Sequence, residues 1–250
     1  MPIPLRRLLI VKTGTTAPEV RAAHGDYDRW FTDALAEHGR TFDLCDATRA
    51  SIPDTSGYAG LLITGSVKSV CRPEPWMDRL VDLLRRAASG NTPPLLGVCF
   101  GGQMMAQALG GRVILSPAGW EIGAVTVDLT TEGRADPLFD GIASPMPVMA
   151  THEDRIESLP SGAVRLAGND SASVQAFRVA ARVWGVQFHP EATPAILRKL
   201  IELRRDRLLE DARRYGRPVE GQIEGLLRGL ERFDPGPAGR LLYNFLATCR

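Results

Sequence analysis

The chain has 250 residues, of which 44% are hydrophobic and 24% are charged. This composition is close to the average for folded globular proteins, and it excludes a disordered or collagen-like chain. The 30 lysines and arginines nearly balance the 29 aspartates and glutamates, so the net charge of +1 gives no reason to expect a nucleic-acid or membrane-surface partner.

The first hundred residues alternate short apolar runs with segments of helical period. The apolar runs predict strands over residues 8–11, 41–45, 60–64 and 95–98. The helical segments cover residues 26–35, 76–88 and 102–109. Gly39, Gly90 and Gly110 follow these segments as C-terminal stops. Strands this apolar that alternate with helices indicate a parallel sheet covered on both faces.

From about residue 112 the pattern changes to short strands joined by glycine, proline and aspartate turns. These strands are predicted over residues 112–115, 123–129, 147–150, 164–167, 174–179 and 182–188. From residue 196 to about 215 the chain is helical and basic, and we interpret its arginines as a solvated helix face. Leu226, Leu227, Leu230 and Phe233 predict a further packed amphipathic helix. We expect one domain, residues 1–194, with a helical C-terminal extension, residues 195–250, packed on it.

The cysteines and the apolar runs indicate where the protein resides. Cys45, Cys71, Cys99 and Cys249 are scattered, without a CxxC motif or a His/Cys cluster, so we expect neither a zinc site nor disulfides. Only four clearly apolar residues precede Lys12, too few for the core of a signal peptide. No apolar run reaches the roughly 18 residues of a membrane span. The sequence therefore predicts a soluble, cytoplasmic protein.

The most informative segment runs from Pro93 to Gln103. A predicted buried strand leads directly into Gly97-x-Cys99-x-Gly101, and a helix follows at once. This layout is that of a nucleophile elbow, a sharp strand-to-helix turn that lifts one side chain above the carboxyl edge of the sheet. At a helix N-terminus the backbone N–H groups and the helix dipole favour a thiolate. The alternative is that Cys99 is an inert thiol, since free cysteines are often buried.

A thiol nucleophile needs a base, and the base needs a group that orients it. We expect His24, in an early loop, and His38, at a helix end, to be surface residues. His189 closes a predicted strand and can therefore face the crevice at the carboxyl edge of the sheet. Glu191, two residues on, is close enough to bond the imidazole and hold its tautomer. The alternative is a capped histidine beside a helix start.

Gly97-Val-Cys99-Phe-Gly-Gly-Gln103 and Gln187-Phe-His189-Pro-Glu191 together resemble the class I, triad-type glutamine amidotransferases, and the resemblance covers about residues 8–194. It implies an α/β fold with a flavodoxin-like, doubly wound, mostly parallel sheet. It also implies that Cys99 is the nucleophile, His189 the acid/base and Glu191 the residue that orients His189. Gln103 is implied to help hold the glutamine substrate. The implied chemistry requires no metal and no organic cofactor.

An oxyanion site is implied by residues 61–66, which end a predicted strand in a small-residue turn like the family's oxyanion loop. Backbone N–H groups at Gly65 and Ser66, with that of Phe100 after the nucleophile, are expected to receive the developing oxyanion. Val67 stands two residues after Gly65, where the family often has proline, so this loop departs from the family pattern. An ordinary strand-end turn is the alternative.

A second loop resembles the strand-end "SHxD…LP" loop of guanylate-synthase-type amidotransferase domains. It runs from Ala150 to Pro160. The resemblance implies that Thr151, His152 and Glu153 lie near the amino-acid end of the substrate. His152 is equally compatible with a structural role.

The predicted function is hydrolysis of a γ-glutamyl amide, such as glutamine to glutamate and ammonia, through a γ-glutamyl thioester. No ATP-pyrophosphatase signature or phosphate loop is visible, so the chain is expected to lack its own synthetase domain. It is then either a glutaminase that delivers ammonia to a separate synthase subunit or a self-sufficient γ-glutamyl peptidase. The segments around Gly25–Phe31 and Trp76 resemble those of the free-standing relatives. A catalytically inactive binding domain remains an alternative. A chaperone- or deglycase-like hydrolase fits poorly, because Phe100 stands where those proteins generally carry histidine.

Overall fold

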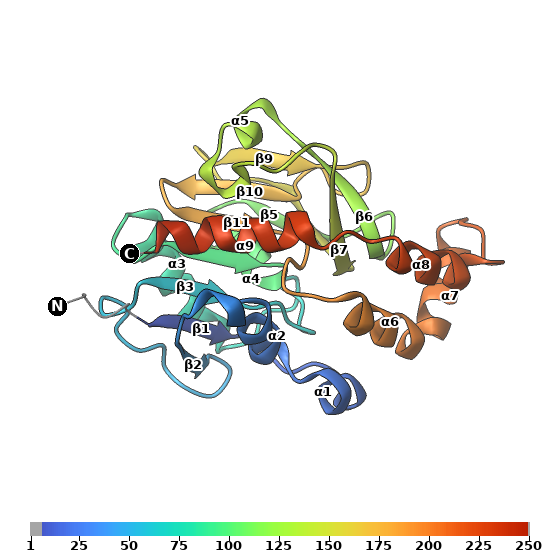
Figure 1. Ribbon diagram of the computed structural model, residues 1–250, viewed down its shortest axis with the longest axis horizontal. Helices are drawn as coiled ribbons and strands as arrows, with labels where there is room; N and C mark the ends of the chain where they lie inside the picture. The colour runs from blue at the N-terminus through green and yellow to red at the C-terminus, as the bar shows by residue number, and fades with distance from the viewer. Residues whose placement is uncertain (1–6, 250) are drawn as a thin grey trace.

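Nine strands form the central sheet of the computed structural model, which describes residues 7–249 (Figure 1). The strands are β1 (Leu8–Lys12), β2 (Phe42–Asp46), β3 (Gly60–Ile63), β4 (Leu95–Val98), β6 (Glu121–Leu129), β7 (Met146–His152), β9 (Val164–Gly168), β10 (Ala176–Ala180) and β11 (Val183–Val186). Their order across the sheet is β2-β1-β3-β4-β11-β10-β9-β6-β7. A separate pair is formed by β5 (Arg112–Leu115) and β8 (Asp154–Ser158). The first six residues, on which part of the signal-peptide prediction falls, lie outside the described chain.

The five strands from β2 to β11 are parallel, which the apolar runs predicted for β1, β2, β3 and β4 but not for β11. Every residue of β3, β4 and β11 is buried. Ile63 is in register with Gly97, and Val98 with Val186. The carboxyl ends of these three neighbouring strands therefore meet at one edge of the sheet, where an open α/β sheet places its ligand.

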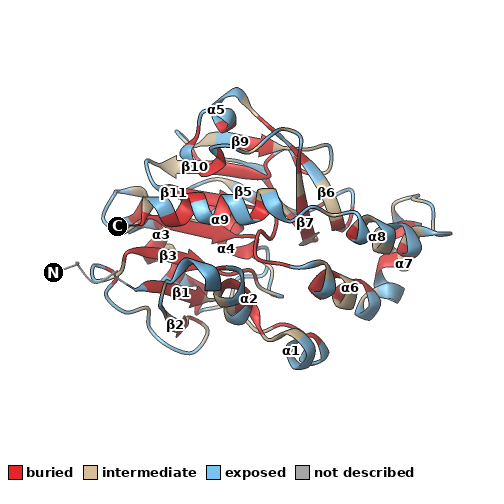
Figure 2. Cartoon of the chain, viewed as in Figure 1, coloured by how far each residue is buried: buried red, intermediate tan, exposed pale blue. Residues whose placement is uncertain are grey.

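Helices cover both faces of this sheet, which confirms the predicted doubly wound α/β fold. On one face α3 (Met77–Ala88) and α4 (Phe100–Ala108) pack against β3 and β4. On the other, α2 (Tyr27–Ala34) and α9 (Gly236–Thr248) pack against β1, β4 and β11. Figure 1 shows α9 crossing in front of the sheet, and Figure 2 shows the central strands buried behind it.

A third group of helices extends from one end of the molecule. It comprises α6 (Pro194–Leu203), α7 (Arg205–Arg214) and α8 (Gln222–Glu231), which share an apolar cluster with α1 (Pro18–His24). Much of α7 and α8 is exposed (Figure 2). The remaining short elements are η1 (Ala36–His38), α5 (Thr131–Arg134) and η2 (Pro137–Phe139).

Several sequence predictions need correction. The basic helix predicted over 196–215 is two helices, since the α-helical pattern breaks at Arg204. His24 ends α1 and does not lie in a loop. The segment 154–158, interpreted as a loop, is strand β8, and α9 lies in the C-terminal extension that was predicted to be helical, although its bounds were not predicted. Within residues 7–249, no helix is long and apolar enough to cross a membrane.

Candidate active site

Cys99 occupies the turn between β4 and α4 with a backbone φ of 49°, and no other non-glycine residue in the described chain has a positive φ. Its N–H donates to the Val186 carbonyl at 2.7 Å, and α4 begins at the next residue. The turn requires glycine around it, because a Cβ on Gly101 would lie 2.7 Å from the Ile63 carbonyl oxygen and one on Gly102 would lie 2.9 Å from that of Val186. This is the predicted elbow geometry.

His189 is positioned by the chain that follows β11. Its N–H donates to the Met149 carbonyl at 2.8 Å, which ties this segment to β7. Its Nδ1 lies 2.7 Å from Glu191 Oε1, and both residues are 2% exposed. The residue pair that the sequence placed two positions apart is thus in direct contact.

The electrostatic surroundings of His189 favour its protonated form. Burial by itself lowers the pKa of an imidazole, but the negative charges of Glu191 and Cys99 and the hydrogen bonds to them outweigh burial and raise the pKa of His189 to about 10. The Gln187 amide donates to Cys99 Sγ at 3.6 Å, and such a donor stabilises negative charge on sulfur. The arrangement therefore suits a protonated His189 beside the sulfur of Cys99.

Gly65, just beyond β3, lies against both of these side chains. A Cβ on this glycine would lie 2.7 Å from His189 Cε1 and 3.6 Å from Cys99 Cβ. The Gly65 carbonyl accepts from the Thr13 and Thr64 hydroxyls, each at 2.9 Å. The three parallel strands β3, β4 and β11 therefore bring Gly65, Cys99 and His189 together at their carboxyl ends.

A cleft of about 530 Å³ opens above this edge. Its lining includes seven of the ten residues that the sequence analysis singled out: Ser66, Cys99, Gln103, Thr151, His152, Glu153 and His189. Gly65, Phe100 and Glu191 do not line it. Phe100 is 1% exposed and its ring stacks on Trp76 with centroids 5.8 Å apart, so only its backbone is available to the site. Cys99 is 5% exposed and reaches the cleft, unlike a sealed structural thiol.

The loop residues are held by other protein groups. Ser66 Oγ donates to the Thr13 carbonyl at 2.7 Å. Both nitrogens of the His152 ring contact oxygens, the Asp154 carbonyl at 3.0 Å and Glu121 Oε2 at 2.8 Å. Burial by itself raises the pKa of Glu121, but His152 and the hydrogen bonds from Asn169 and Gln175 outweigh burial and lower it. These contacts hold the His152 side chain in place in the cleft lining.

Gln103 is braced in the same way. Its Nε2 donates to the Asp154 carbonyl at 2.9 Å and to Gln187 Oε1 at 3.1 Å. These bonds commit its amide donors to the protein and connect α4 with β8 and with the segment after β11. A role in substrate binding remains a prediction for Gln103.

The cleft residues that sequence reasoning missed include four that lie far from the two motifs. They are Tyr27 on α2, Trp120 before β6, Arg204 between α6 and α7, and Arg207 on α7. Arg204 donates to Thr151 Oγ1 at 2.6 Å, and Arg207 to Glu153 Oε2 at 2.6 Å. Among the described residues, no cluster of three or more His, Cys, Asp or Glu side chains is arranged to hold a metal ion.

Comparisons with known proteins show the family of the chain and its fold. The family described as "Glutamine amidotransferase class-I" matches residues 23–202. The chain is 27% identical over 188 residues to γ-glutamyl peptidase 5 of Arabidopsis thaliana, covering 73% of this chain and 74% of that one. It is 35% identical over 139 residues to a glutamine-hydrolysing GMP synthase of Porphyromonas gingivalis, covering 55% of this chain and 26% of the synthase. The crystal structure of a glutamine amidotransferase from Methylobacillus flagellatus has a TM-score of 0.78 at 23% identity and covers 98% of this chain and 96% of that one.

Proposed function

Because the chain belongs to the class-I glutamine amidotransferase family, we propose that it is a thiol hydrolase that cleaves γ-glutamyl amide bonds without a partner subunit. The observation that carries the proposal is the contact network at the sheet edge. Cys99 sits on a strained turn, His189 has a raised pKa beside it, and Glu191 bonds the far side of the imidazole. In this proposal Cys99 is the nucleophile, His189 is the general acid/base and Glu191 is the carboxylate that orients the imidazole.

In the first step, the Cys99 thiolate attacks the side-chain carbonyl carbon of the γ-glutamyl group and forms an S–C bond. The electron pair of the C=O double bond moves to oxygen. Phe100 N–H belongs to the first turn of α4, where N–H groups have no partner within the helix. The Gly65 carbonyl points toward Thr13 and Thr64, so the Ser66 N–H of the same trans peptide points the opposite way. We assign the oxyanion to these two donors.

In the second step, the electron pair on the oxyanion re-forms the C=O double bond, the C–N bond breaks, and His189 gives its proton to the departing nitrogen. A γ-glutamyl thioester remains on Cys99. The imidazole, now neutral, takes a proton from water as the water attacks the thioester, and glutamate and the thiolate are released. Glu191 holds Nδ1 throughout, so Nε2 is the nitrogen that exchanges protons with substrate and water.

The test is glutamate release from glutamine, a γ-glutamyl dipeptide and a γ-glutamyl alkylamide by the purified chain. We expect Cys99→Ala to reduce the rate to background, a loss of more than about 10⁴-fold. Cys71→Ala is the matched control, since Cys71 is an exposed thiol that also lines the cleft, and it is expected to keep wild-type activity. Equal rates for Cys99→Ala and the wild type would overturn the assignment of the nucleophile.

The second candidate is a glutaminase that supplies ammonia to a separate synthase, which the similarity to a glutamine-hydrolysing GMP synthase favours. It predicts a different pattern in the same assay. The isolated chain would hydrolyse glutamine slowly and dipeptides not at all. An inactive binding domain would bind a γ-glutamyl compound without turnover by the wild type.

A further inference from the structure

Arg204 is the single residue between α6 and α7, and its side chain enters the cleft that contains Cys99. Its backbone N–H donates to the Leu200 carbonyl of α6 at 3.1 Å, and its carbonyl accepts from the Leu208 N–H of α7 at 2.8 Å. The guanidinium stacks over Trp120 at 4.8 Å from the ring centroid. Trp120 is itself held by Asp211, which accepts its backbone N–H at 3.1 Å. The charge of Arg204 is therefore fixed in position before any substrate binds.

The contacts of this guanidinium are all to uncharged groups. Its hydrogen bond goes to the Thr151 hydroxyl, and in the described chain no carboxylate lies within salt-bridge distance of it. The two carboxylates that line the cleft have other partners, since Glu153 pairs with Arg207 and Asp154 accepts from the Ser69 hydroxyl. Burial is the largest effect on the pKa of Arg204 and, with Arg207, lowers it against the opposing effects of Tyr27, Cys99 and Glu153.

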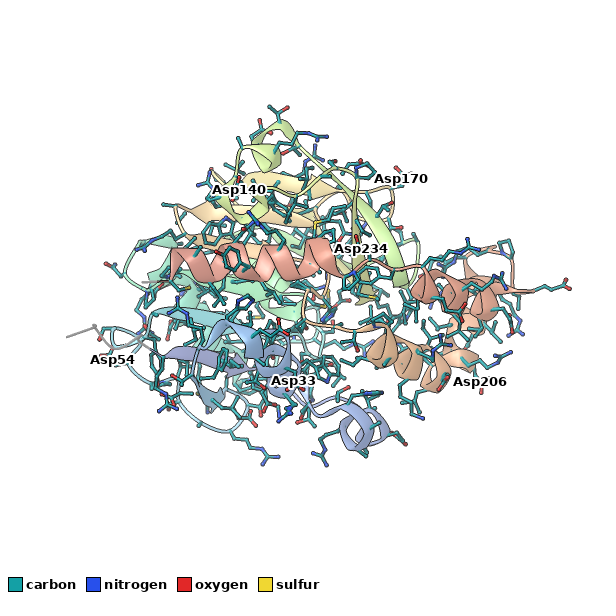
Figure 3. All side chains as sticks on the ribbon, in the orientation of Figure 1. Asp33, Asp54, Asp140, Asp170, Asp206 and Asp234 are labelled. Carbon is teal, nitrogen blue, oxygen red and sulfur yellow. The ribbon has the colours of Figure 1, made fainter. Side chains whose placement is uncertain are left out.

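The charge of the cleft lining points the same way. Four lysine and arginine side chains line it, against one glutamate and one aspartate. The six aspartates labelled in Figure 3 are exposed, and none of them lines the cleft. Arg204 is a partly buried arginine without a salt-bridge partner, in the same cleft as Cys99, and a ligand carboxylate could form an ion pair with it.

We propose that Arg204 binds a carboxylate of the γ-glutamyl substrate and so restricts the enzyme to substrates that carry one there. This inference rests on the proposed function. A γ-glutamyl substrate has an α-carboxylate on the glutamyl group, and a γ-glutamyl amino acid has a second carboxylate on the leaving group. The chemistry that Arg204 recognises is the same for both, and steady-state kinetics with matched substrates separates them.

The kinetic experiment compares the wild type with Arg204→Gln on glutamine, γ-glutamylglycine and 4-aminobutanamide, which lacks the α-carboxylate. A charge-assisted, two-point hydrogen bond predicts a KM about 10- to 100-fold higher in the variant. A rise for γ-glutamylglycine but not glutamine assigns the leaving-group carboxylate. An equal rise for both, absent with 4-aminobutanamide, assigns the α-carboxylate. A rise of the same size with 4-aminobutanamide, or no rise with any substrate, overturns the proposal.

Arg205→Gln is the control for the loss of one positive charge at the same place in the chain. Arg205 is adjacent and exposed, lies near Glu224, and does not line the cleft, so its KM values are expected to equal those of the wild type. Arg204→Lys keeps the charge without the planar fork and is expected to recover part of the loss.

A binding measurement separates failure of this inference from failure of the proposed function. Calorimetry with γ-glutamylglycine on Cys99→Ala protein requires no turnover. If that protein binds the dipeptide and the added Arg204→Gln change weakens binding about 10- to 100-fold, the inference stands. If the added change has no effect, Arg204 is not the carboxylate site. If Cys99→Ala itself does not bind the dipeptide, the substrate class is wrong and the inference fails with it.

Discussion

Replacing Gly65 with alanine puts a methyl group against both Cys99 and His189. The new Cβ would lie 2.7 Å from His189 Cε1, which is 0.7 Å closer than the 3.4 Å at which ordinary van der Waals contact begins. It would also lie 3.6 Å from Cys99 Cβ, which is an acceptable contact. The imidazole is therefore the group that must move, whereas the thiol can stay in place.

The size of this displacement sets the expected loss of activity. The His189 ring is buried and bonded to Glu191 at 2.7 Å, so it has little room to move without stretching that bond. A shift of about 1 Å in a catalytic group costs about 10²-fold in rate. For Gly65→Ala we expect kcat/KM to fall about 10- to 100-fold, mainly through kcat, because substrate contacts elsewhere in the cleft are unchanged.

The assay is glutamate release under steady-state conditions, with thermal unfolding measured in parallel. The matched control is Gly57→Ala, in the segment before β3, where an added Cβ has no neighbour within 4 Å. Both glycines have a φ outside the left-handed region, so neither alanine strains the backbone. A Gly65→Ala protein that keeps wild-type kcat/KM would refute the close placement of His189 and the nucleophile.

Two further predictions concern the charge of His189 and the packing of α9. Glu191→Gln removes the carboxylate that raises the pKa of His189 to about 10, so the alkaline limb of kcat/KM, expected near pH 10, should move down by about 1–3 pH units, and an unmoved limb would contradict the assignment. The pKa of His189 lies above the 6.5 of a free histidine, so the interactions that raise it stabilise the folded state fully below pH 6.5. This stabilisation is lost as the pH rises through 10. Urea denaturation at several pH values should therefore show the free energy of unfolding falling over this range, and falling less in Glu191→Gln. Phe245→Ala should lower the free energy of unfolding by about 3–5 kcal/mol, since Phe245 is fully buried and packs edge-on against Trp184. Urea denaturation measures the free energy of unfolding. The control is Tyr243→Ala, an exposed residue on the same helix, which should change that free energy by less than about 1 kcal/mol. A loss that small for Phe245→Ala would contradict the assignment of α9 to the core.

The sequence predicted most of the parallel part of the sheet because its central strands are buried. Residues in β3, β4 and β11 face helices on one side or the other, so each strand is an uninterrupted apolar run. Strand β8 gave no such signal. It is held in a two-stranded pair, and its five residues, Asp154–Ser158, include three charged ones and a single aliphatic, so their pattern resembles a loop.

The apolar residues of α9 have the spacing of an amphipathic helix. Ala238, Leu241, Leu242 and Phe245 follow the i, i+3, i+4, i+7 spacing of one helical face, and all four are buried. The segment begins with Pro235-Gly-Pro, which resembles a turn, although proline is favoured in the first turn of a helix. The expected division at residue 194 stays a prediction.

The part of the site that involves Arg204 was not predictable from local pattern. Within the basic segment after Pro194 every arginine has similar neighbours, and the solvated-face interpretation suits Arg205, whose side chain is exposed. The position of the break between α6 and α7 decides which arginine turns inward. That break depends on packing against Trp120 and Thr151, which come from distant parts of the chain.

The positive φ of Cys99 means that folding and reactivity make opposite demands on one residue. A side chain held in that conformation costs about 1–3 kcal/mol, whereas glycine adopts it freely. Cys99→Gly would therefore relax the backbone and raise the free energy of unfolding, while it removed the thiol. In the proposed function, the cysteine at this turn therefore lowers the stability of the fold in exchange for a nucleophile.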